Sequence, residues 1–148
     1  MKVYNLTRAH IQQINNITNA LLKVSLLDIK DIETYPYLLI IQSTIENSIK
    51  LTIYPLKRNK IIKVTFSGFN FSSEIIDNIT SILQNFQVIH TSGALVINKQ
   101  LFYECYLNLS INDIKFVDLK ATLDKIKNIF KEVKIEEIGL KKSKLNEL

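Results

Sequence analysis

The sequence predicts an α+β fold, in which a single antiparallel sheet is packed with helices in the order helix, three strands, helix, two strands, helix. Residues 101–109 alternate between two faces, as a half-buried antiparallel strand requires. From Phe116 to Val133 apolar residues recur at intervals of three and four, which is typical of a helix with one buried face. The 148 residues, 47% of them apolar, are enough for one domain with a substantial core.

The N-terminal part is expected to form one helix and a three-stranded meander. Thr7 can cap the helix, whose apolar face would carry Ile11, Ile14, Ile17, Leu21 and Leu22. After a connector, the apolar run at residues 37–41 predicts a buried strand. Alternating apolar residues then predict two further strands, at 49–53 and 62–66, joined by a basic turn.

The C-terminal part is expected to supply two helices and a hairpin. Asn70, Ser72 and Ser73 are candidate caps for a helix with an apolar stripe between Ile75 and Phe86. Residues 94–97 and 101–109 form the hairpin, and the helix from Phe116 follows. Residues 134–140 fit either an extension of that helix or a last strand. We therefore predict a single domain over residues 1–140 and a basic, mobile tail at 141–148.

This order of elements resembles a known fold family. The residue pattern that carries the resemblance lies at 83–86, 92–97, 102–107 and 118–123. It is similar to the type III secretion chaperones of the CesT kind and the related YbjN-type domains. The resemblance implies a five-stranded sheet, no enzymatic activity, a homodimer, and binding of protein segments.

A second interpretation depends on the last segment. If residues 133–138 form a strand, residues 61–139 take the order β-α-β-β-α-β, which looks like an ACT-type ferredoxin-like domain. The turn Gly68-Phe69-Asn70 would then bind a small metabolite. We prefer the continuous sheet, because the alternative leaves two extra strands at residues 37–55.

Catalytic and cofactor motifs are absent from the sequence. The three glycines are scattered, so no phosphate-binding loop is predicted. His10, His90 and Cys105 are too few and too far apart for a metal site. His90 and Cys105 are expected on one sheet face, which is the arrangement that a catalytic Cys–His dyad would need. The apolar neighbours of Cys105 on that face favour a core residue instead. We expect that the protein has no enzymatic activity and binds neither a metal ion nor a cofactor.

The best candidate site for a protein partner or a second copy is formed by Phe102, Glu104 and Tyr106, which place two aromatic rings on the nominally polar strand face. Nucleic-acid binding is the alternative, suggested by a net charge of +5. Its candidate residues are Lys57, Arg58, Lys60, Lys63, Lys141, Lys142 and Lys144. A single cysteine and no apolar run long enough for a signal peptide or membrane span predict a cytoplasmic protein.

Overall fold

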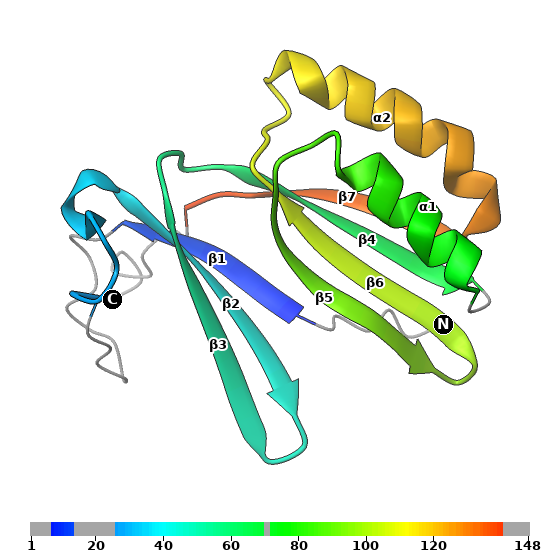
Figure 1. Ribbon diagram of the computed structural model, residues 1–148, viewed down its shortest axis with the longest axis horizontal. Helices are drawn as coiled ribbons and strands as arrows, with labels where there is room; N and C mark the ends of the chain where they lie inside the picture. The colour runs from blue at the N-terminus through cyan, green and yellow to red at the C-terminus, as the bar shows by residue number, and fades with distance from the viewer. Residues whose placement is uncertain (1–6, 14–25, 70–71, 141–148) are drawn as a thin grey trace, which may run out of the picture. The chain divides into compact units, whose positions relative to one another are not determined.

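The computed structural model describes residues 7–13, 26–69 and 72–140, and the chain divides into two compact units (Figure 1). The described part of the α+β unit is residues 61–69 and 72–137, and that of the three-stranded unit is residues 7–13, 26–60 and 138–140. Each unit has its own sheet. The predicted single domain over 1–140 stays a prediction, and the predicted tail at 141–148 lies outside the described residues.

The α+β unit holds a four-stranded antiparallel sheet in the order β5-β6-β4-β7. Its elements are β4 (Ile61–Phe69), α1 (Ser73–Leu83), β5 (Val88–Ile97), β6 (Gln100–Leu107), α2 (Ile114–Ile126), the 3-10 turn η3 (Lys127–Ile129) and β7 (Glu132–Ile138). Figure 1 shows both helices on the same face of this sheet. The order β-α-β-β-α-β is that of a ferredoxin-like fold.

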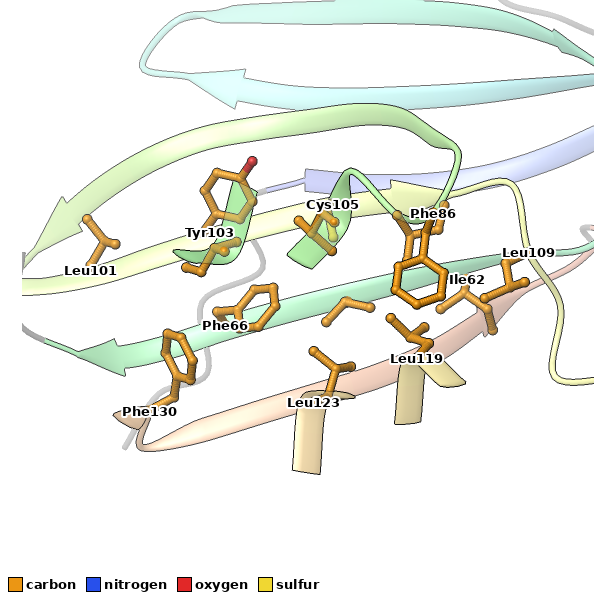
Figure 2. Packing of buried hydrophobic residues seen from close by; sticks show 14 residues of the cluster. Ile62, Phe66, Phe86, Leu101, Tyr103, Cys105, Leu109, Leu119, Leu123 and Phe130 are labelled. Atoms are coloured by element: carbon orange, nitrogen blue, oxygen red, sulfur yellow. The ribbon is translucent and has the colours of Figure 1, made fainter. Parts of the chain in front are cut away.

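The core of the α+β unit lies between its sheet and its two helices (Figure 2). Alternate residues of β4 and β6 point toward the helices, because successive side chains of a strand face opposite sides. They meet the apolar stripes of α1 and α2, and Ser72 Oγ caps α1 by accepting from the Ile75 N–H at 3.2 Å. The buried members are Ile62, Val64, Phe66, Ile79, Leu83, Phe86, Leu101, Tyr103, Cys105, Leu107, Leu109, Leu119, Leu123 and Phe130.

The three-stranded unit is an antiparallel sheet in the order β1-β2-β3. Its strands are β1 (Thr7–Gln13), β2 (Tyr37–Ile45) and β3 (Ser48–Leu56), and a short 3-10 turn, η2 (Ile32–Thr34), precedes β2. A two-residue turn at 46–47 joins β2 to β3, which pair without interruption from Tyr37↔Leu56 to Ile45↔Ser48. Leu140 forms a parallel bridge with Ile11 on β1.

The predicted single sheet with three helices is wrong, because the described residues contain two sheets and two α-helices. The first error is at the N-terminus, where Thr7–Gln13 forms β1 instead of a helix. All seven residues of β1 pair with β2, from Thr7↔Ser43 to Gln13↔Tyr37. This distant pairing outweighs a helical period that is weakly supported by local propensity. The rest of the predicted helix, at 14–25, lies outside the described residues.

The second error is the length of the last helix. The predicted stripe from Phe116 to Val133 is divided among α2, the segment after η3 and β7, although all of its members pack into one core. Residues 132–138 alternate, with Val133 and Ile135 directed to the core, and the edge of β4 was available for pairing. The last strand of the second interpretation is therefore confirmed, as are the strands that became β2 to β6 and the helix α1.

Candidate functional site

The structure buries all three residues that were predicted to bind a protein partner. Phe102, Glu104 and Tyr106 lie on the face of the sheet that is turned away from α1 and α2. Glu104 Oε1 is 3.1 Å from the Lys63 ammonium, and both side chains are at least 95% buried. The same ammonium lies 5.7 Å from the centroid of the Tyr106 ring. These residues are buried polar and aromatic side chains, and their role in binding a protein partner stays a prediction.

The basic residues of the nucleic-acid alternative do not form one described patch. Lys57 and Lys60 are exposed in the three-stranded unit, whereas Lys63 belongs to the α+β unit and is buried against Glu104. Lys57 donates to the Thr34 carbonyl at 3.2 Å and lies 4.7 Å from the centroid of the Tyr35 ring. Lys141, Lys142 and Lys144 lie outside the described residues.

The structure separates His90 from Cys105. A bulge at Gly93, where φ is +75°, shifts the register of β5 between Thr91 and Ala94. Thr91 therefore lies opposite Cys105, and His90 lies opposite Tyr106 on the other face, with ring centroids 6.0 Å apart. Burial raises the pKa of the Cys105 thiol to about 12, although a backbone hydrogen bond involving Val64 acts in the opposite direction. A thiol of this kind is a core group and a poor nucleophile at neutral pH.

Three of the four outer sheet edges are protected in ways that are common in natural proteins. Leu140 bridges the outer side of β1 at Ile11. β5 has two register shifts, which interrupt the regular spacing of its backbone groups. β7 carries charges at Glu132, Lys134, Glu136 and Glu137, the last of which accepts from the Ile111 N–H at 3.1 Å. Irregular or charged edges of this kind disfavour pairing with another strand.

The outer edge of β3 is protected less, by Lys50 and by Pro55 near the end of the strand. Among the described residues no strand lies beyond it, and its nine residues contain a single charge, Lys50. Pro55 has no N–H, so its pairing with Leu38 is of the kind that exchanges no hydrogen bond. Hydrogen-bonded and non-hydrogen-bonded pairs alternate along an antiparallel ladder. Ile53, Leu51 and Ile49 therefore form non-hydrogen-bonded pairs with β2, as Pro55 does. Their N–H and C=O groups therefore point outward from the edge.

Exposed apolar side chains accompany this open backbone. Ile49 is 63% exposed and Leu51 is 39% exposed, and both share one sheet face with the half-buried Ile53. At the tip of the hairpin, Ile45 is 60% exposed on the opposite face. The sequence showed the alternation of this strand, but only the pairing scheme identifies β3 as the strand at the end of the sheet.

A second group of exposed apolar residues surrounds the start of α2. It consists of Ile111, Ile114 and Val117. Ile114 and Val117 are one helical turn apart and point away from the stripe that packs into the core. This group offers side chains alone, because the backbone groups of a helix are largely used within the helix.

Comparison with known proteins gives this chain no family. No protein-family model and no curated protein matches it. The described residues contain no group of three or more His, Cys, Asp or Glu side chains that could hold a metal ion. Of the helices described, none is long and apolar enough to cross a membrane.

Proposed function

We propose that this chain is a non-enzymatic protein-binding domain, and that the outer edge of β3 is its binding surface. A partner would contribute one extended segment, which would extend the three-stranded sheet by another strand. Main-chain hydrogen bonds supply the affinity in this mode of recognition, and alternate side chains supply the specificity. The observation that carries the proposal is the combination, in one regular strand, of outward backbone groups with the exposed side chains of Ile49 and Leu51.

The interior of the α+β unit supports a structural role better than a catalytic one. Its buried charges, Lys63 and Glu104, neutralise each other, and its cysteine is buried and protonated at neutral pH. The tilted rings of Phe66, Tyr103 and Phe130 fill the space beneath the helices. We interpret the interior of this unit as a structural core.

The ferredoxin-like order by itself favours no function, because the same fold supports many unrelated activities. A metabolite-binding role at the turn after β4 gains no support from the described residues, since positions 70–71 lie outside them. For a nucleic-acid-binding role, Lys63 is a poor phosphate contact, because its side chain is buried against Glu104. Strand addition at β3 thus has the strongest structural argument.

The proposal can be tested with short peptides and amide chemical shifts. A panel of nine-residue peptides that alternate valine with threonine would be titrated into the isotopically labelled protein at a concentration where it is monomeric, with proline-containing peptides of equal length as controls. We expect saturable shifts at the amides of Ile49, Leu51 and Ile53, whose N–H groups point outward. The proline peptides should produce none, because they lack the donors for a ladder.

A pair of matched variants tests the same surface. Leu51→Lys adds a charge at the β3 edge, whereas Ile45→Lys adds the same charge on β2 of the same hairpin, at a more exposed position. Peptide binding should be weakened by the first substitution and retained by the second. Shifts confined to β5, β7 or α2, or equal effects of the two variants, would rule out the β3 edge as the binding surface.

A further inference from the structure

We infer that the extended segment bound at the β3 edge is β3 of a second copy of this chain, paired antiparallel with Leu51 opposite Leu51. This inference rests on the proposed function, because it names the partner of that same edge. Two three-stranded sheets would thereby join into one sheet of six strands around a twofold axis. Such a contact is isologous, so one surface must be complementary to itself.

The backbone of β3 meets that requirement. In an antiparallel ladder, residues with outward N–H and C=O groups must lie opposite residues of the same kind. With Leu51 at the twofold axis, Ile49 lies opposite Ile53 of the second copy, and Ile53 lies opposite Ile49. Each of these three pairs exchanges two hydrogen bonds. The outward N–H and C=O groups of Ile49, Leu51 and Ile53 are then satisfied, and the Pro55 carbonyl lies beyond the new ladder.

The side chains are also complementary in this register. Ile49, Leu51 and Ile53 of both copies gather on one face of the joined sheet, which covers apolar surface that is exposed in the single chain. On the other face Lys50 lies opposite Thr52, so the one charge of the strand meets a neutral residue. The two Lys50 side chains are diagonal neighbours at a separation of about 7–8 Å.

Pro55 and the turn limit the pairing to this register. A shift that places Leu51 opposite Ile53 also places Ile49 opposite Pro55, which has no N–H to donate. That register therefore lacks one of the hydrogen bonds that the register centred on Leu51 forms. A shift in the opposite direction places Ile53 opposite Asn47, which belongs to the turn. The register centred on Leu51 avoids both.

Cysteine crosslinking tests the register directly. Hydrogen-bonded pairs have Cα atoms about 5.5 Å apart, which is within the range of a disulfide. We therefore expect Leu51→Cys to form a covalent dimer on mild oxidation at least about ten times faster than Thr52→Cys, whose two copies are only diagonal neighbours. The unmodified chain is the blank, because Cys105 is buried. Equal rates for the two variants would overturn the register.

Sedimentation equilibrium tests the dimer itself. The unmodified chain and Ile45→Lys should be dimeric, and Leu51→Lys should raise the dimer dissociation constant at least about tenfold, because it places two lysines opposite each other. Added salt should strengthen the unmodified dimer by screening the two Lys50 charges. Circular dichroism of each variant confirms that the fold is retained.

The outcomes separate this inference from the proposed function. A monomer that binds the alternating peptides at β3 would refute self-association and leave the protein-binding function standing. A monomer that binds none of them would refute both. A dimer that persists unchanged in Leu51→Lys would show that the copies meet through another surface, and would overturn the inference.

Discussion

Replacing Gly68 with alanine should destabilise the α+β unit strongly, because two independent costs meet at this residue. Gly68 has a φ of +74°, in the left-handed region that side chains rarely adopt. In addition, a Cβ atom at this position would overlap the Cβ atom of Lys131. The Lys131 N–H donates to the carbonyls of Ser67, at 3.0 Å, and of Gly68, at 3.2 Å. These bonds hold the chain entering β7 close to the end of β4.

The size of the effect follows from these two costs. Placing an L-residue in the left-handed region costs about 1–2 kcal/mol, and forcing additional atoms into occupied space costs about 1–3 kcal/mol. Gly68→Ala should therefore lower the free energy of unfolding by about 2–5 kcal/mol. Gly93 is a matched control, since its φ is +75° but nothing lies within 4 Å of the position of a Cβ. Gly93→Ala should cost about 1–2 kcal/mol.

Urea denaturation, followed through amide signals of the α+β unit, measures both free energies. Adding Lys131→Gly removes the overlapping atom, so the double variant with Gly68→Ala should recover the steric part and leave the conformational part. If Gly68→Ala is no more harmful than Gly93→Ala, or if Lys131→Gly brings no recovery, the close approach of β4 and the chain before β7 is incorrect.

Three further predictions concern buried charges, the thiol and the basic turn. Lys63→Met should lower the unfolding free energy by about 3–5 kcal/mol, because it removes one member of the buried ion pair with Glu104, and Lys63→Met with Glu104→Leu should recover most of the loss. Equal losses of unfolding free energy for the single and the double variant in urea titrations would contradict this. The folded-state pKa of Cys105 is raised from 9.0 to about 12, so its contribution to stability is complete below pH 9 and declines as the pH rises from 9 toward 12. Cys105→Val should remove that decline. Urea denaturation midpoints of the unmodified chain and of Cys105→Val, measured between pH 8 and 10.5 in steps of about half a unit, test this, and the same pH dependence in both proteins would contradict it. Finally, we expect no retardation of single- or double-stranded nucleic acid at physiological salt; retardation that is lost when the basic side chains of the 57–60 turn become alanine would favour the alternative function.

The elements that could be predicted are those with a local cause. The alternation in β3, β4 and β6 reflects the two-residue period of a strand, and the stripe in α1 reflects the helical period. The core face of β6, with Tyr103, Cys105 and Leu107, was also predictable, because one face of the strand is apolar throughout. On the opposite face Phe102 and Tyr106 are buried despite their polar neighbours, which the alternation did not predict.

The candidate site could not be predicted, because an edge is a property of a whole sheet. Ile49 and Leu51 look like ordinary members of a meander until the order β1-β2-β3 places them at its end. In the same way, a one-residue bulge at Gly93 moved His90 to the face away from Cys105. An isolated glycine inside a strand is a local signal for such a bulge, whereas no local pattern identifies the edge of a sheet.

The sequence by itself determined where most strands and helix α1 lie, because backbone geometry imposes their periods on neighbouring residues. Only the tertiary structure decided that Thr7–Gln13 and Glu132–Ile138 are strands, that the strands divide between two sheets, and that β3 ends one of them. The physical reason is that strand pairing joins residues far apart in the chain. Its hydrogen bonds outweigh the weak local preferences of a short segment.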